Sequence, residues 1–179
     1  MIIPDFIYEP REDSKLMKKH IKDYAKGFVL DMGTGSAVQA IESSIYAKKV
    51  LAVDVDENII EWCNDNIDKR KIEFQQSDLF NRVEGRFDLI TFNPPYLPDD
   101  EGIKDKALYG GKYGCETIIK FLREAADYLV DNGKILLIFT SFSKPEKIIE
   151  TMKKLDYKYK IIDKVHISFE DIFLYEIKK

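Results

Sequence analysis

This chain of 179 residues has few cysteines and no long hydrophobic run. Its two cysteines, Cys63 and Cys115, are far apart and belong to no Cys-x-x-Cys or Cys/His pattern. We therefore expect reduced thiols, no metal site and a cytoplasmic location. No apolar stretch approaches the ~20 residues that span a membrane. Residues 1–7 are too short for a signal peptide and include a proline and an aspartate, so no association with a membrane is expected.

An excess of positive charge is also missing. The chain has 28 Lys and Arg against 32 Asp and Glu, and its sequence pI is about 5.4. This balance argues against a strong general affinity for nucleic acid, although it permits a local basic patch. With 45% hydrophobic and 34% charged residues, we expect one globular domain over residues 1–179. Residues 1–26 would form an N-terminal arm and helix, and residues 27–179 the core.

Predicted strands and helices alternate along most of the chain. Strands are predicted at Gly27–Asp31, Lys49–Asp54, Lys71–Gln75, Phe87–Phe92 and Lys134–Phe139, with closing strands at Tyr159–Ile167 and Ile172–Ile177. Helices are predicted at Lys15–Ala25, Ala37–Tyr46, Glu57–Asp68, Cys115–Val130 and Lys144–Leu155. Asp13 or Ser14 could cap the first of these helices, and Asp131-Asn132-Gly133 would end the fourth. The short link between the closing strands requires an antiparallel hairpin. This order predicts an α/β, Rossmann-like fold with a mostly parallel seven-stranded sheet, an antiparallel C-terminal hairpin and helices on both faces.

A glycine-rich turn follows the first strand of the predicted core. Gly33 and Gly35 stand between a strand and a helix, where glycine lets the backbone approach a ligand closely. The dinucleotide fingerprint is incomplete, because Val38 occupies the place of its third small residue. Asp31, just before the turn, would repel a pyrophosphate. The turn therefore suits a ligand that has a cationic end and no phosphate.

Two further strands end in carboxylates. Asp54 lies about twenty residues beyond the glycine turn, the distance at which an acidic side chain binds ribose hydroxyls. A plainer interpretation is that Asp54 caps the next helix, which Asp56 could also do. Asp78, in Ser-Asp-Leu at 77–79, could accept a hydrogen bond from an adenine amino group or could serve only to form a turn.

The stretch Asn93-Pro94-Pro95-Tyr96 ends the fourth strand and is the most informative motif in the chain. Two prolines fix the backbone just beyond the strand, at the sheet edge where ligands of open α/β proteins bind. The Asn93 side-chain oxygen and the Pro94 carbonyl can together accept both hydrogens of a planar NH2 group. Tyr96 can pack on the face of that group. A proline-rich turn with no chemical role is the simpler alternative.

A long polar segment, residues 98–114, follows this motif and is rich in glycine. Loops of such length in compact domains are often lids over binding sites. Its position next to Asn93-Pro94-Pro95-Tyr96 makes it a candidate substrate-binding lid.

Taken together, the motifs resemble those of class I S-adenosylmethionine-dependent methyltransferases. They are Asp-Met-Gly-Thr-Gly-Ser at 31–36, the single Asp54, Ser-Asp-Leu at 77–79 and Asn-Pro-Pro-Tyr at 93–96. The chain is more narrowly similar to the HemK-type protein-glutamine N5-methyltransferases, in the archaeal and eukaryotic branch that modifies the class I peptide release factor. Tyr-Glu-Pro-Arg-Glu-Asp-Ser at 8–14 and Leu-Tyr-Gly-Gly-Lys-Tyr-Gly at 108–114 carry that narrower resemblance. The helical N-terminal domain of the bacterial members has no counterpart in this sequence, and Ser14 replaces the commoner threonine.

The resemblance implies a cofactor, a set of site residues and two partners. The cofactor is S-adenosyl-L-methionine, which becomes S-adenosyl-L-homocysteine. The residues placed around it are Ser14, Asp31, Gly33, Gly35, Asp54, Asp78, Leu79 and Asn93. Asn93, Pro94, Pro95 and Tyr96 would bind the substrate glutamine, with Asn93, Pro94 and Tyr96 as the catalytic group. The partners are a class I peptide release factor, as substrate, and a small zinc-binding activator that would form a heterodimer at the predicted edge strand Lys71–Gln75.

Four other functions remain open on the sequence alone. An N6-adenine methyltransferase acting on DNA or RNA is the strongest alternative, because the Asn93 motif grips an exocyclic amine as readily as an amide. The acidic charge and the lack of a target-recognition domain argue against it. Protein-lysine methylation is weaker, since an ammonium group must first lose a proton. A nicotinamide-dependent oxidoreductase and a non-catalytic adaptor with the same fold complete the set.

Overall fold

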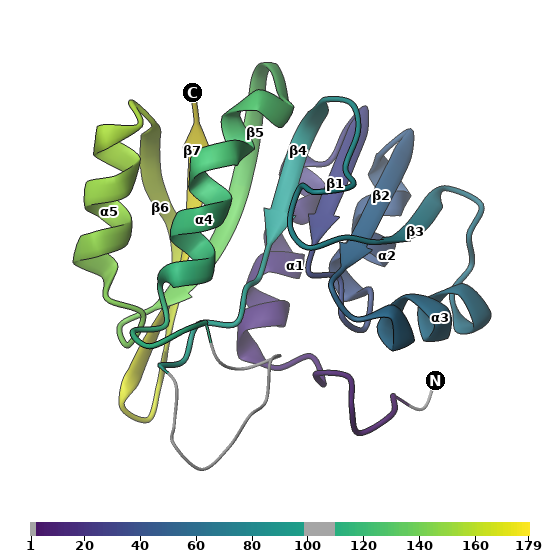
Figure 1. The fold of residues 1–179 in the computed structure, drawn as a ribbon, viewed down its shortest axis with the longest axis horizontal. Helices are drawn as coiled ribbons and strands as arrows, with labels where there is room; N and C mark the ends of the chain where they lie inside the picture. Colours follow the sequence, from purple (N-terminus) through teal and green to yellow (C-terminus); the bar gives the residue numbers. More distant parts are fainter. Residues whose placement is uncertain (1–2, 99–109) are drawn as a thin grey trace.

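A computed structural model describes residues 3–98 and 110–179 of the chain and contains a seven-stranded sheet (Figure 1). The strands are β1 (Phe28–Met32), β2 (Lys49–Asp54), β3 (Ile72–Gln76), β4 (Phe87–Phe92), β5 (Leu129–Thr140), β6 (Lys158–Ile167) and β7 (Glu170–Lys178). Their order is β3-β2-β1-β4-β5-β7-β6, with the first five parallel and β7 antiparallel to both of its neighbours. The predicted Rossmann-like sheet with an antiparallel C-terminal hairpin is thus confirmed.

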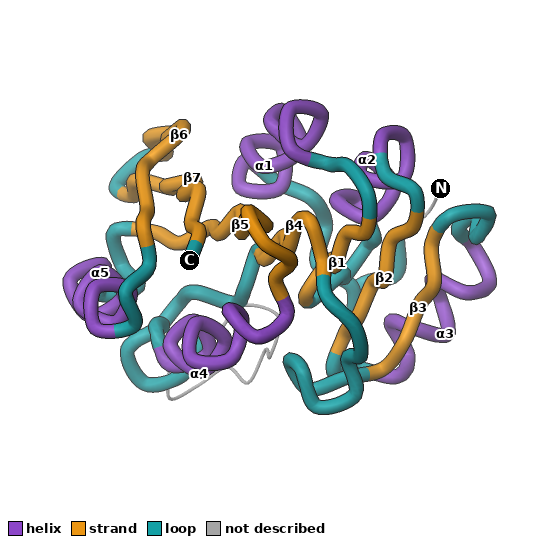
Figure 2. Tube along the Cα trace, turned by 90° about the horizontal axis from the view of Figure 1, so that it is seen from above, coloured by secondary structure: helices purple, strands orange, loops and turns teal. Residues whose placement is uncertain are grey.

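Helices cover both faces of this sheet, as predicted. They are α1 (Glu12–Tyr24), α2 (Val38–Tyr46), α3 (Glu57–Asn66), α4 (Glu116–Ala125) and α5 (Pro145–Lys154), with a short 3-10 helix at Ala126–Tyr128. Figure 2 shows α1 and α2 on one side of the strands and α4 and α5 on the other. Successive strand residues point to opposite faces. Val29 therefore packs in the core beneath α1, α2 and α3, and Leu30 in the core beneath α4 and α5.

The fourth predicted helix was too long at its C-terminal end. Helix α4 ends at Ala125, and the segment Asp131-Asn132-Gly133, expected to end that helix, lies inside β5 instead. Asn132 has a φ of 64°, and Gly133 approaches the Phe87 carbonyl so closely that an added Cβ would lie 2.9 Å from it. The turn residues thus make an irregularity in β5, which pairs with β4 again from Lys134 onward.

Helix α1 begins earlier than predicted, and this places acidic side chains near the sheet. The helix starts at Glu12, so neither Asp13 nor Ser14 caps it; both lie buried in its first turn. The far part of α1 is attached to β6, where Asp163 Oδ2 lies 2.7 Å from His20 Nε2 and 2.9 Å from Lys19 Nζ. Hydrogen bonds from these two side chains lower the pKa of Asp163 to about 2.

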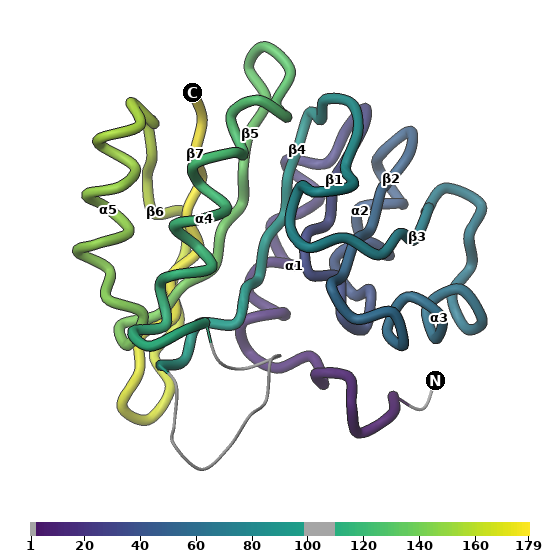
Figure 3. Tube along the Cα trace, in the orientation of Figure 1, coloured from purple at the N-terminus to yellow at the C-terminus, as the bar shows by residue number. Residues whose placement is uncertain are grey.

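One end of the sheet collects segments from distant parts of the chain. The N-terminal segment, the end of β4 and the turn between β6 and β7 all lie at this end, along the lower part of Figure 3. The carboxyl ends of β1, β2 and β4 point toward the same edge, which is where ligands bind in open α/β sheets. In the described part of the chain, none of the helices has both the length and the apolar character that crossing a membrane would require.

Candidate active site

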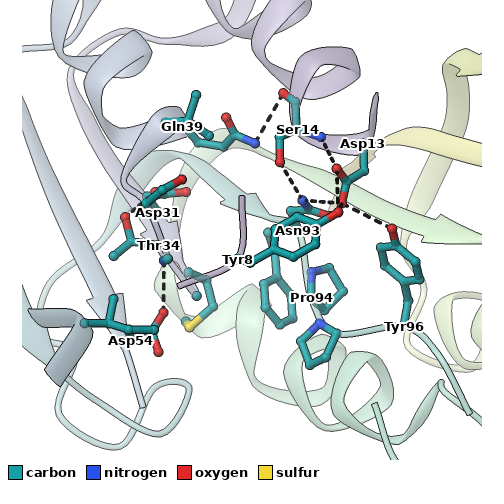
Figure 4. A pocket seen from close by; sticks show the side chains of 18 of the residues that line it. Tyr8, Asp13, Ser14, Asp31, Thr34, Gln39, Asp54, Asn93, Pro94 and Tyr96 are labelled. Atoms are coloured by element: carbon teal, nitrogen blue, oxygen red, sulfur yellow. Dashed lines mark hydrogen bonds between the residues drawn. The ribbon is translucent and has the colours of Figure 1, made fainter. Parts of the chain in front are cut away.

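A cavity of about 880 Å³ lies at the carboxyl ends of β1, β2 and β4. Every site residue predicted from the sequence lines it: Ser14, Asp31, Gly33, Gly35, Asp54, Asp78, Leu79, Asn93, Pro94, Pro95 and Tyr96. Figure 4 shows Ser14, Asn93 and Tyr96 gathered on one side of this site and Asp31 and Asp54 on the other. The residues come from α1, from three strand ends and from the loops after them, so only the folded sheet brings them together.

The glycine turn leaves open space at its tip. Gly33 and Gly35 have φ values of 64° and 49°, a backbone conformation that side chains rarely adopt. An added Cβ at Gly33 would contact the ring of Phe92 at 3.5 Å, whereas one at Gly35 would meet nothing within 4 Å. Because Gly35 also lines the cavity, a ligand can approach its backbone directly.

Asp31 is almost fully buried at the end of β1. Its Oδ2 accepts a hydrogen bond from Thr34 Oγ1, and its Oδ1 accepts one from Thr91 Oγ1, both at 2.7 Å. Burial raises the pKa of this carboxyl from 3.8 to about 6, although the two hydroxyl bonds oppose the shift. A buried carboxylate without an opposite charge nearby is energetically costly. A cationic group bound beside Asp31 would therefore be stabilised by it.

Asp56, and not Asp54, caps the next helix. Asp56 is the N-cap of α3, where its side chain accepts a hydrogen bond from the backbone N–H of Asn58. Asp54 holds the glycine turn instead: its Oδ2 accepts from the Gly35 N–H at 3.0 Å, and its Oδ1 accepts from the Asp56 N–H at 3.1 Å. Burial raises the pKa of Asp54 as well.

Asp78 lines the cavity but also has a partner outside it. Its carboxylate oxygens lie 3.2 and 3.3 Å from Lys120 Nζ, in an exposed ion pair. The next residue, Leu79, has a φ of 48° and is buried. Ser77 fixes this turn, since its hydroxyl donates to the Leu79 carbonyl at 2.7 Å. The segment 77–79 thus both forms a turn and lines the cavity.

Asn93 stands at the centre of the cavity wall with its amide group oriented by α1. Its Nδ2 donates to Asp13 Oδ2 at 3.0 Å and lies 3.4 Å from Ser14 Oγ. Its Oδ1 is buried and has no hydrogen-bond partner among the described residues. A buried amide oxygen without a partner is costly. Because Asn93 lines the cavity, a ligand donor that reached this oxygen would supply the missing partner.

Two tyrosine hydroxyls converge on the same carboxylate. Tyr96 and Tyr8 both donate to Asp13 Oδ2, each at 3.2 Å. Burial and the charge of Asp13 raise the pKa of both phenols above its usual value, so both remain protonated donors. From the sequence, Asp13 was predicted only as a possible helix cap. The sole signal for a different role was its position in the Tyr8–Ser14 motif.

The predicted lid is described only at its two ends, because residues 99–109 lie outside the described part of the chain. Its C-terminal end packs on the proline motif. The Gly110 N–H donates to the Leu97 carbonyl at 2.9 Å, and Gly110 itself sits against the Pro95 carbonyl. A Cβ added to Gly110 would clash with that carbonyl oxygen, so only glycine fits there without a shift.

Gly110→Ala should therefore displace the Pro95 backbone and, with it, the neighbouring Asn93 and Tyr96. Overpacking of this kind costs about 1–3 kcal/mol, and we expect a melting temperature lower by roughly 2–10 °C together with a lower turnover number. Gly85→Ala is the control for turnover: a Cβ there would meet nothing within 4 Å, and its φ of 89° makes the substitution costly in stability alone. Calorimetry and steady-state kinetics on both variants make the comparison. Unchanged stability and turnover in Gly110→Ala would contradict the packing described here.

Comparison with known proteins identifies the family of this chain. The family model for the methyltransferase small domain matches residues 11–164. A Methanocaldococcus jannaschii protein, provisionally assigned as a protein N5-glutamine methyltransferase, is 34% identical over 176 residues, 94% of this chain and 89% of that protein. Methyltransferase HEMK2 of Mus musculus is 30% identical over 166 residues, 82% of this chain and 78% of that protein. The chain therefore belongs to the methyltransferase small domain family, among its protein glutamine N5-methyltransferases.

A solved structure has the same fold as this chain. The Mtq2-Trm112 complex of E. cuniculi, described as responsible for methylation of the translation termination factor eRF1, has a chain that superposes with a TM-score of 0.80. The superposition covers 97% of this chain and 99% of that chain, at 23% sequence identity. The mixed seven-stranded sheet with helices on both faces is thus the architecture of a known methyltransferase.

Proposed function

We propose that this protein methylates the side-chain nitrogen of a glutamine, using S-adenosyl-L-methionine bound in the cavity. When bound, that cofactor supplies the methyl group. The residues present fit it: Gly35 leaves backbone open to a ligand, and Asp31 offers a buried carboxylate to a cationic amino group. Asp54, already fixed to the glycine turn, would face the ribose, and Ser14 and Leu79 would complete the wall. Asp78 would reach the adenine amino group only if it shared its pairing with Lys120.

The single observation that carries the proposal is the unpartnered Oδ1 of Asn93. It would accept one hydrogen of the substrate amide, and the Pro94 carbonyl would accept the other. The lone pair of an amide nitrogen is delocalised, so the nitrogen is a poor nucleophile. Two fixed acceptors hold it in place and stabilise the positive charge that develops on it. Tyr96, held through its hydroxyl by Asp13, would fix the plane of the amide. The four-residue motif contains no dedicated base, so the proton would leave to water.

The substrate we propose is a class I peptide release factor of the archaeal and eukaryotic type. The support is the E. cuniculi complex, described as methylating eRF1, and the glutamine methyltransferase names of the relatives. That complex also supports a second chain as a partner. We propose that a small activator, zinc-binding as the family resemblance implies, pairs with β3, which is an edge strand in this sheet.

Methyl transfer from labelled S-adenosylmethionine tests the reaction. The acceptors are an archaeal-type release factor, its Gln→Ala variant at the Gly-Gly-Gln motif, DNA and RNA, each with activator present. We expect label on the unmodified release factor alone. Label on nucleic acid instead would assign the enzyme to adenine and reject the glutamine proposal. Label on the Gln→Ala factor would place the acceptor at a different residue.

The place of the activator is tested at the exposed edge of β3. The Lys71 carbonyl and the Ser77 N–H, at the two ends of the strand, both bond to β2. Because N–H groups alternate in direction along a strand, those of the even-numbered residues face outward. Gln76→Pro removes one of them, and we expect much weaker co-purification with the activator. A complex of undiminished affinity would argue against docking at β3.

Cofactor affinity should depend on pH through Asp31. Its carboxyl is neutral below a pKa of about 6, and only the carboxylate attracts a cation. Affinity should therefore fall as the pH drops, by roughly tenfold between pH 7 and pH 5, with proton release on binding near pH 6. Calorimetric titration in buffers of different ionisation enthalpy measures both effects. Asp31→Asn should bind the cofactor more weakly, and its affinity should no longer change near pH 6. A change of affinity near pH 6 that survives in this variant would belong to another group.

A further inference from the structure

The first turn of α1 contributes a carboxylate whose hydrogen-bond donors, among the described residues, are all neutral. Asp13 is 2% exposed. Its Oδ1 accepts from the Ser14 N–H at 2.6 Å, and its Oδ2 accepts from Asn93 Nδ2 at 3.0 Å. The hydroxyls of Tyr8 and Tyr96 complete the set, each at 3.2 Å from Oδ2 (Figure 4). Four donors satisfy the charge, and two of the side chains that they belong to lie in the proline motif.

This arrangement decides which way the Asn93 amide points. A carboxylate can only accept hydrogen bonds, so Asn93 must turn its NH2 toward Asp13 and its oxygen away from it. The flipped amide would bring two oxygens to within about the same 3.0 Å and lose a bond to a charged acceptor. The unpartnered Oδ1 described above is the result of this constraint. The constraint comes from a residue 80 positions away in the sequence.

We propose that Asp13 is a positioning residue for methyl transfer: it sets the polarity of the Asn93 amide, so that an acceptor and not a donor faces the reacting nitrogen. Through Tyr96 it also fixes the ring beside that nitrogen. Asp13 itself touches neither substrate nor cofactor in this role. The inference rests on the proposed function, in which Asn93 Oδ1 accepts a hydrogen from the substrate amide.

Asp13→Asn tests the polarity directly, because the two side chains have nearly the same shape. The Ser14 N–H, which lies 2.6 Å from Oδ1 in the wild type, would hold the oxygen of the new amide by the same hydrogen bond. The NH2 of residue 13 would then face Asn93 and invert its amide, which would present a donor to the substrate. We expect kcat to fall on the order of 10- to 100-fold, with cofactor affinity within about threefold of wild type. Asp23→Asn, on the exposed face of the same helix, is the matched control and should be unchanged.

Exchanging the two residues separates positioning from support of the fold. In Asp13→Asn with Asn93→Asp, the amide at 13 donates to the carboxylate at 93, and the other oxygen of that carboxylate faces the substrate. The double variant should recover at least tenfold over Asn93→Asp alone, in which two carboxylates face each other. Wild-type kcat in Asp13→Asn would overturn the proposal. So would a double variant no more active than Asn93→Asp.

A measurement without substrate keeps this inference apart from the proposed reaction. In 15N-labelled protein, the side-chain NH2 protons of Asn93 should resonate far apart, because one of them is bonded to a carboxylate. Asp13→Asn should collapse that separation, and Asp23→Asn should leave it. An intact separation in Asp13→Asn would overturn the inference. If the separation collapses but the wild-type enzyme methylates no glutamine, the reaction assignment fails while the control of the amide by Asp13 stands.

Discussion

Asn93→Ala is expected to lower methyl transfer on the order of a thousandfold while the protein folds and retains part of its affinity for S-adenosylmethionine. The substitution removes the free Oδ1 that would hold the substrate amide, together with the Nδ2 that bonds Asp13. The glycine turn, Asp31 and Asp54 do not contact this amide, so most of the cofactor site remains. Single-turnover transfer to the release factor measures the first effect, and calorimetric titration measures the second.

Asn81→Ala is the control for this experiment, because Asn81 is exposed and its backbone, not its side chain, bonds Asp78. Its turnover should equal that of wild type. If Asn93→Ala also turned over at nearly the wild-type rate, the assignment of Asn93 as the acceptor would be wrong. A loss of cofactor binding equal to the loss of transfer would instead make Asn93 a cofactor residue only.

Gly35→Ala is expected to weaken cofactor binding by roughly 30-fold, or about 2 kcal/mol. The added methyl group would stand in the open space at the tip of the glycine turn, where a ligand must approach the backbone. The substitution also costs about 1 kcal/mol of stability, because alanine is strained at a φ of 49°. Titration calorimetry and thermal unfolding separate the two effects.

Gly85→Ala is again the matched control. Gly85 has a φ of 89°, and an added Cβ would also meet nothing within 4 Å, yet the residue does not line the cavity. We expect a similar loss of stability and no loss of cofactor affinity. Equal affinities in the two variants would mean that the ligand does not lie against the glycine turn.

The sequence predicted the sheet well because each strand is marked by local composition. The run Phe87–Phe92, for example, is mostly apolar, with Gly85 shortly before it and Pro94 shortly after it. The predicted helix end at Asp131–Gly133 was wrong because it, too, relied on local composition. Those residues favour a turn, but pairing with β4 on either side of them keeps them inside β5. Tertiary contacts override a turn signal where a strand can continue on both sides of it.

The wall of the site was predictable wherever one motif carries its own chemistry. Asp54 and Asn93 stand at strand ends, so the residue type and the position together indicate a ligand. Asp13 was missed because its role depends on Asn93, 80 residues away, and no local pattern records that distance. Thr91 was missed likewise: its hydroxyl bonds Asp31, its partner across the β1–β4 pair, from within an apolar strand.

The bonds that join α1 and β1 to β4 and to the residue after it also bear on the order in which the protein folds. Asp13 and Asn93 are 80 residues apart, and Asp31 and Thr91 are 60 apart, so both contacts close long loops. Contacts of large sequence separation form slowly, because loop entropy is lost before they give any stabilisation. On a growing chain, α1 leaves the ribosome well before β4 and must wait for it. Helix content alone would then not distinguish the fully folded enzyme from a chain that still lacks these contacts. Cofactor binding would distinguish them, because it requires the completed tertiary structure.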